Sequence, residues 1–93
     1  QLAEIVDAVG DKLDVICEGG IHRGTHMLKA LSLGAKACSG GRLYLYALAA
    51  AGQTGVERAV SQYRAELERD MKLMGCTKIS ELNRNNLRFR NIR

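Results

Sequence analysis

Two short glycine-containing motifs hold the residues that could bind an anion. Cys17-Glu18-Gly19-Gly20 and Cys38-Ser39-Gly40-Gly41 repeat one pattern, and each is followed by an arginine, Arg23 or Arg42. Glycine admits positive φ and lets a ligand approach the backbone closely. A helix that starts after such a turn offers unpaired N–H groups and the positive end of its dipole. Arginine can bind a phosphate through two parallel hydrogen bonds. Each glycine pair alone is typical of a tight turn, but together the two motifs predict a phosphate site.

The segments around these motifs predict alternating strands and helices. Short apolar runs at 13–17 and 35–39 end at the two motifs and are typical of strands buried on both faces of a parallel sheet. Apolar residues at three- and four-residue spacing predict helices between and after them. The expected helices cover residues 2–9, about 25–33, 43–51, 54–74 and, more briefly, 79–82. The order strand, helix, strand, helix is the repeat of an α/β barrel or of a doubly wound sheet.

Capping residues predict where these helices begin and end. Thr54 and Glu57 form a capping-box signature at the start of the long helix. Gly24 or Thr25 is the expected cap of the helix between the strands. Helix ends are expected at four glycines, namely Gly10, Gly34, Gly52 and Gly75.

Composition restricts the class of protein. The chain has 93 residues, so a single domain is expected, and 46% of them are apolar, which is enough for a packed core. A net charge of +4 fits a phosphate-bearing ligand, a nucleic acid or an ordinary surface with a basic tail. The tail at 83–93 has four arginines but no aromatic platform, which favours a solvated or subunit-contacting segment over nucleic-acid binding.

Three cysteines without a Cys-x-x-Cys pair indicate neither a disulfide framework nor a zinc site. Cys17 and Cys38 are expected to be small buried apolar residues in a reducing, cytoplasmic protein. No apolar run is long enough to span a membrane, and the N-terminus lacks the basic start of a signal peptide. The chain begins within a helical pattern, as a segment of a longer protein would.

Two further pairs of side chains could serve a ligand. His22 and His26 are four residues apart, but no Cys, Asp or Glu at suitable spacing completes a metal site, so a solvent-facing pair is favoured. Tyr44 and Tyr46 alternate with leucines and are expected to pack in the core or against a subunit.

Residues 18–26 resemble a motif of a known family. They read Glu-Gly-Gly-Ile-His-Arg-Gly-Thr-His, and they are followed by Lys-Ala-Leu-Ser-Leu-Gly-Ala at 29–35, Gly-Arg-Leu-Tyr-Leu-Tyr at 41–46 and Met-Lys-Leu-Met-Gly-Cys at 71–76. This is similar to the C-terminal part of the FMN-dependent α-hydroxy-acid dehydrogenases and oxidases, which include L-lactate dehydrogenase and glycolate oxidase. The resemblance implies an α/β fold, with residues 1–93 forming the C-terminal part of a single FMN-binding domain. They would supply the last two βα units (strands 7 and 8) of a TIM (β/α)₈ barrel, plus C-terminal helices.

The resemblance also implies a cofactor site for the FMN phosphate. Its residues would be Glu18, Gly19, Gly20, His22, Arg23, Gly41 and Arg42. The family's acidic residue at the position of Glu18 reaches the ribityl chain, while Gly41 would offer its backbone N–H and Arg42 its guanidinium. Glu18 replaces an Asp, His22 an Arg, His26 an acidic residue, and Gly40 an Ile or Val. A neutral imidazole makes fewer bonds to phosphate than a guanidinium, so FMN affinity is expected to be below that of the family, or absent.

By the same resemblance, the parent protein oxidises an L-2-hydroxy acid, with L-lactate the first expectation. The family's catalytic His would lie before residue 1, so the chain alone would contain no catalytic residue and be inactive. Its partners would be the remainder of the barrel or further copies of itself. A homo-oligomer (a tetramer in the family) and peripheral membrane association of the parent are also implied.

Two alternatives stay open. One is a segment of another phosphate-binding barrel, such as inosine monophosphate dehydrogenase or flavin-dependent isopentenyl diphosphate isomerase. The other is a non-catalytic remnant or self-associating module without cofactor.

Overall fold

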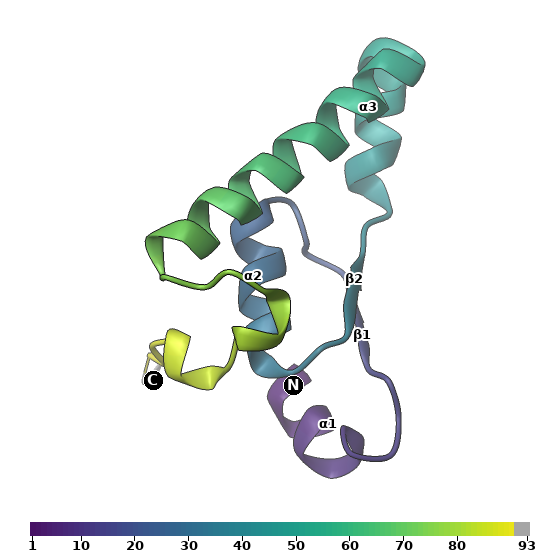
Figure 1. Ribbon diagram of the computed structural model, residues 1–93. Coiled ribbons are helices and arrows are strands. Elements are labelled where there is room, and N and C mark those ends of the chain that lie inside the picture. The colour runs from purple at the N-terminus through teal and green to yellow at the C-terminus, as the bar shows by residue number, and fades with distance from the viewer. Residues whose placement is uncertain (91–93) are drawn as a thin grey trace.

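The computed structural model describes residues 1–90, in which helices and strands alternate as the sequence predicts (Figure 1). Two 3-10 turns, η1 and η2, follow the last helix. The elements in chain order are α1 (Leu2–Val9), β1 (Ile16–Glu18), α2 (Gly24–Leu33), β2 (Ala37–Ser39), α3 (Arg42–Leu73), η1 (Ile79–Glu81) and η2 (Arg84–Asn86).

The two strands form a parallel pair in which Cys17 lies opposite Cys38. Both strands are shorter than the apolar runs that predicted them at 13–17 and 35–39. Pairing starts only at Ile16 and Ala37, and Leu13 lies outside it with 62% of its surface exposed. Each strand has a single neighbour here, so only the segments that face each other form a ladder.

The two faces of this sheet are buried to different extents. Cys17 and Cys38 lie on the half-buried face, where the Cys38 Sγ is 3.9 Å from the Met27 carbonyl oxygen of α2. Side chains on the opposite face are exposed, and Ile16 shows 62% of its surface. The expectation that both cysteines are buried is therefore met only in part, because other elements pack against one face of the sheet only. Both are free thiols, and burial, with a smaller effect of Cys17, raises the pKa of Cys38.

The second half of α3 crosses α2 and forms the core with it (Figure 1). Leu28 is 2% exposed and packs with Met71 and Leu82. The two helices approach most closely at Gly24, where an added Cβ would lie 2.6 Å from the Tyr63 carbonyl oxygen. Absence of a side chain at Gly24 thus sets the distance between α2 and α3.

The start of α2 differs from the prediction. Gly24 and Thr25 are already helical, and the N-cap is Arg23, in extended backbone and without a side-chain cap of its own. Gly34 ends the helix in the left-handed conformation, as predicted, with φ 113°.

A kink divides α3 into the two helices that the sequence predicts. Ala51 (φ −151°) and Gly52 (φ 58°) are the non-helical residues. The predicted capping box is wrong, because Thr54 lies inside the helix rather than at its extended N-cap position. The Glu57 carboxylate instead accepts a hydrogen bond from Gln53 Nε2 at 2.9 Å.

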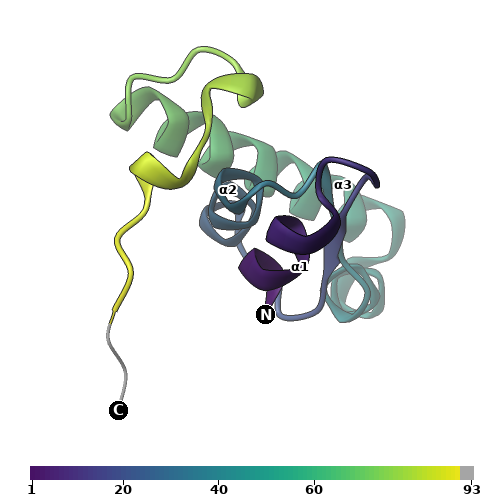
Figure 2. The ribbon, with the colours of Figure 1, turned by 90° about the horizontal axis from the view of Figure 1, so that it is seen from below.

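The start of the basic tail docks on its own chain. Arg84 donates to the Asp7 carboxylate at 2.8 Å and to the Ala3 carbonyl oxygen at 3.3 Å, both on α1. Figure 2 shows residues 87–90, which follow η2, leading away from the helices. The predicted tail at 83–93 is therefore partly ordered against α1, while its last residues, 91–93, lie outside the described part of the chain.

Candidate functional site

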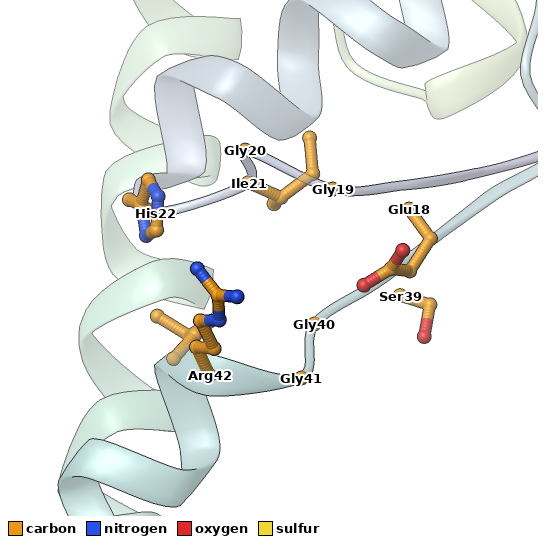
Figure 3. Close-up of a pocket in the computed structure, with 10 residues that line it drawn as sticks. Glu18, Gly19, Gly20, Ile21, His22, Ser39, Gly40, Gly41 and Arg42 are labelled. Carbon is orange, nitrogen blue, oxygen red and sulfur yellow. The ribbon is translucent and has the colours of Figure 1, made fainter.

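A cavity of about 280 Å³ lies where the two strands end (Figure 3). Its walls are the loop after β1 and the turn between β2 and α3. The lining residues are Glu18, Gly19, Gly20, Ile21, His22, Ser39, Gly40, Gly41, Arg42 and Leu43. Six of the seven residues that the sequence suggested for the phosphate are among them, and Arg23 is not. The parallel pairing of β1 and β2 brings both glycine motifs to one edge.

The two glycine pairs have different conformations. Gly19 (φ 97°) and Gly20 (φ 72°) are both in the left-handed region, as expected for a turn that only glycine adopts easily. Gly41 has φ −103°, and Gly40 is also outside that region, so the expectation of positive φ is wrong for the second pair. Gly40 instead provides space, because an added Cβ would lie 2.8 Å from Leu43 Cδ2.

The start of α3 is open toward the cavity. Gly41 is the N-cap and has no side-chain cap, and its carbonyl oxygen accepts from Tyr44 N and Leu45 N. The helix begins at Arg42, so the N–H groups of Arg42 and Leu43 have no intrahelical acceptor. Both residues line the cavity, where these groups and the helix dipole favour an anion.

The start of α2 is already occupied by a carboxylate. Glu66 of α3 accepts from Thr25 N at 3.0 Å, and the Arg23 guanidinium donates to both Glu66 oxygens at 3.2 Å. The Thr25 backbone bond and the Arg23 side chain lower the pKa of Glu66 to about 2. Only one of the two helix starts therefore remains available for a ligand, and Arg23 is directed to Glu66.

His22 and His26 form a local contact rather than a free pair. The His22 backbone N donates to His26 Nδ1 at 3.1 Å, and the rings meet edge to face at 6.3 Å. His26 Nδ1 is thus an acceptor in this contact. The His22 ring faces the Arg42 guanidinium across the cavity (Figure 3). Within residues 1–90, no group of three metal-ligating side chains gathers anywhere.

The acidic side of the cavity is Glu18. A Cβ added at Gly41 would lie 3.7 Å from Glu18 Oε1, so this carboxylate reaches across to the second motif. Four lining residues were not among the expected cofactor ligands, namely Ile21, Ser39, Gly40 and Leu43. The repeat of the Cys-x-Gly-Gly pattern could have indicated Ser39 and Gly40, because it places them at the equivalent strand end.

The cavity has the features required for the phosphate end of a nucleotide. It combines a helix start, the Arg42 guanidinium and two glycines that leave room for close backbone contact. Its other polar side chains are Glu18, His22 and Ser39. The arrangement can therefore bind and orient an anion.

Comparison with known proteins agrees with this geometry. The family model for FMN-dependent dehydrogenases matches residues 1–89. The chain belongs to the FMN-dependent dehydrogenase family. FMN is accordingly its cofactor, and the fit of the cavity to a phosphate is consistent with that.

Relatives within the FMN-dependent dehydrogenase family differ in substrate. A peroxisomal (S)-2-hydroxyacid oxidase of Arabidopsis thaliana is 42% identical over 92 residues, covering 99% of this chain and 25% of that protein. A cytochrome L-lactate dehydrogenase of Saccharomyces cerevisiae is 51% identical over 72 residues, covering 77% of this chain and 12% of that protein. The solved structure of a soluble mutant of the membrane-associated (S)-mandelate dehydrogenase from Pseudomonas putida superposes with a TM-score of 0.87. It is 38% identical, and the match covers 94% of this chain and 24% of that one.

The matched structures also show which fold this chain shares with its relatives and how much of their length it spans. Mandelate dehydrogenase is a TIM-barrel enzyme, so this chain has the structure of a segment of such a barrel, with two strands and three helices. It spans about a quarter of the length of the hydroxyacid oxidase that it matches. Among residues 1–90, no helix combines the length and apolar character needed to cross a bilayer.

Proposed function

We propose that this chain is the phosphate-binding part of an FMN-dependent enzyme that oxidises an L-2-hydroxy acid, with L-lactate as substrate, to the 2-oxo acid. The single observation that carries the proposal is the cavity in which Gly19, Gly20 and Arg42 meet at the open start of α3. Lactate is favoured among the substrates of the relatives because the cytochrome L-lactate dehydrogenase shows 51% identity over its matched segment.

The residues of this chain would bind and orient the cofactor. FMN, when bound, supplies the capacity to accept a hydride equivalent from a hydroxy acid. The N–H groups of Arg42 and Leu43 would donate to phosphate oxygens, and the Arg42 guanidinium would neutralise their charge. Glu18 would accept hydrogen bonds from hydroxyl groups of the ribityl chain, since a carboxylate is an acceptor only. None of these residues is placed to remove a proton from a substrate, so turnover by the 93-residue chain alone is not expected.

We further propose that the exposed side of the sheet is covered by the remainder of a barrel or by further copies of the chain. Ile16 of β1 is 62% exposed, and two paired strands alone rarely form a stable sheet. Leu45, near the start of α3, is also 59% exposed. Light scattering tests this by measuring the mass of the chain alone and of the chain mixed with a separate polypeptide that carries the other barrel units. Self-association of the chain alone, or a complex with the added polypeptide, is expected. The cytoplasmic location stays a prediction.

The experiment that tests the proposed function compares FMN with riboflavin, which lacks the phosphate. The purified chain is titrated with each flavin, and quenching of flavin fluorescence gives the two affinities. FMN is expected to bind more tightly, and Arg42→Ala should remove most of that preference by deleting a charged hydrogen bond, an effect of about tenfold or more. Arg64→Ala is the matched control, because Arg64 is 80% exposed in an ion pair with Glu68 on α3. Equal affinities for the two flavins in the unmodified chain would contradict the proposal.

A specific observation favours a second function, a non-catalytic module that has lost the cofactor. Glu18 and His22 both line the cavity, and both differ from the residues of the family motif that they resemble. The longer Glu18 carboxylate reaches toward Gly41, where it would repel a phosphate. A purified chain that is colourless and takes up no added FMN, even at millimolar concentration, would support this second function.

A further inference from the structure

We propose that Glu66 is a positioning residue for the anion cavity. It lies on α3, caps the N-terminus of α2 and thereby holds the loop after β1 in the conformation that binds the ligand. The inference rests on the proposed function, because it concerns the loop that would hold the phosphate. Glu66 itself lies outside the cavity and would act through Arg23 and Thr25.

The Glu66 carboxylate accepts three hydrogen bonds from N–H groups of one short segment. Thr25 donates its backbone N–H at 3.0 Å, and Arg23 donates Nε and Nη2, both at 3.2 Å. The Thr25 hydroxyl lies between two carboxylates, 3.0 Å from Glu66 Oε1 and 2.6 Å from Asp70 Oδ2, and its single proton favours the shorter contact with Asp70. The Glu66 side chain is only 18% exposed, so solvent competes weakly for these bonds. The low pKa of Glu66 agrees with a carboxylate held ionised by these donors.

This contact is a helix cap supplied from a distant part of the chain. Arg23, the N-cap of α2, offers no side-chain acceptor to the first turn. Glu66 provides it instead, and its negative charge sits at the positive end of the α2 dipole. Because the carboxylate already fills this anion position, a phosphate in the cavity would be directed to the start of α3.

The cap reaches the cavity through the loop between β1 and α2. At the first end of this loop, Glu18 is held by its pairing with Ser39 in the sheet. At the other end, Arg23 directly follows His22, which is the last residue of the loop that lines the cavity. Between them stand Gly19 and Gly20, both at positive φ and without side chains to restrain them. The buried Ile21 side chain and the bond from His22 N to His26 Nδ1 hold the middle of the loop, and the Glu66 contacts hold its end at Arg23. Without the Glu66 contacts, the N–H groups of the two glycines would lose one of the restraints that fix their directions.

The test uses Glu66→Gln, with Glu68→Gln as the matched control. Glu68 lies on the same helix and forms an ion pair with Arg64, but it does not contact α2. Backbone ¹⁵N relaxation reports loop order without any ligand. In Glu66→Gln the order parameters of Gly19 and Gly20 are expected to fall from about 0.85 toward about 0.6, and in Glu68→Gln to stay unchanged.

A second pair of variants keeps the test valid if Glu66→Gln fails to fold. Thr25→Val removes the hydroxyl that lies within hydrogen-bond distance of both Glu66 and Asp70, whereas Thr25→Ser keeps it. Loop order should fall in the Val variant and be retained in the Ser variant. The preference for FMN over riboflavin should fall by about tenfold in Glu66→Gln and in Thr25→Val, because riboflavin does not use the phosphate position.

The outcomes separate this inference from the proposed function. Loop order unchanged in Glu66→Gln, or lowered equally over α1, α2 and the loop, would overturn the positioning role, since a general loss of stability moves all elements together. Selective loss of loop order in a chain that shows no preference for FMN would uphold the positioning role and reject the proposed function.

Discussion

Replacing Gly24 by alanine is expected to destabilise the chain strongly, because the new methyl group would meet two backbone atoms and the Cβ of Glu66, none of which a side-chain rotation can move. The added Cβ would lie 2.6 Å from the Tyr63 carbonyl oxygen and 2.7 Å from Leu67 N. Ordinary contact begins at 3.4 Å, so α2 and α3 must separate by about 3.4 − 2.6 = 0.8 Å. No rotation of a side chain can relieve this overlap.

The separation also affects the cap of α2. The Thr25 N to Glu66 distance of 3.0 Å would lengthen by the same shift to about 3.8 Å, beyond hydrogen-bond range. Overpacking costs about 1–3 kcal/mol, and loss of a bond to a charged group costs about 1.5–3 kcal/mol. Because the two effects share one displacement, we expect a loss of about 2–5 kcal/mol and a decrease in Tm of at least about 10 °C.

Thermal and urea unfolding followed by circular dichroism measure this loss, with Gly40→Ala as the control. A Cβ at Gly40 would also make short contacts, at 2.8 Å and 3.1 Å, but with the ends of the Leu43 and Tyr44 side chains, which can move. Gly40→Ala is therefore expected to change stability by less than about 1 kcal/mol. Equal losses in the two variants, or an unchanged Tm in Gly24→Ala, would show that backbone approach does not set the helix distance.

Three further predictions follow from other contacts. The ionised form of Glu66 is favoured in the folded chain, since its pKa falls from 4.5 to about 2; its contribution to stability is therefore complete above about pH 4.5 and disappears as the pH falls toward 2. Urea midpoints across this range should show that loss in the unmodified chain and less of it in Glu66→Gln. His22→Arg should raise FMN affinity by about tenfold, by adding a charged donor to the cavity, and flavin fluorescence titration checks it against His22→Gln. Leu28→Ala should cost about 2–5 kcal/mol in urea unfolding, because Leu28 is 2% exposed in the core; a cost below about 1 kcal/mol would mean that the site collapses around the smaller side chain.

Local patterns were sufficient to predict the order of elements and the place of the cavity. Apolar spacing and the glycines gave the helices and the kink at Gly52, because both depend on neighbouring residues alone. The repeated motif placed Gly20 and Arg42 at the same edge, since parallel strands present their carboxyl ends together. The family motif identified the cofactor.

Contacts between distant segments could not be predicted in the same way. Glu66 is 43 residues from Arg23, and no local signal connects the two. For that reason the sequence assigned Arg23 to the phosphate, although in the fold its guanidinium bonds Glu66. The capping box at Thr54 shows the opposite error, in which a correct local signature is overridden because the helix already begins at the kink.

The kink at Gly52 makes the position of Glu66 depend on the number of residues in the second part of α3. Each residue added after Gly52 would turn the rest of the helix by about 100° and advance it by about 1.5 Å. A single insertion would therefore rotate Glu66 away from Thr25 and leave the first part of α3, with Arg42, in place. Only insertions that return the Glu66 carboxylate to the same side of the helix would keep the cap of α2. The number of residues between Gly52 and Glu66 is therefore more tightly constrained by this contact than the identity of the exposed side chains between them.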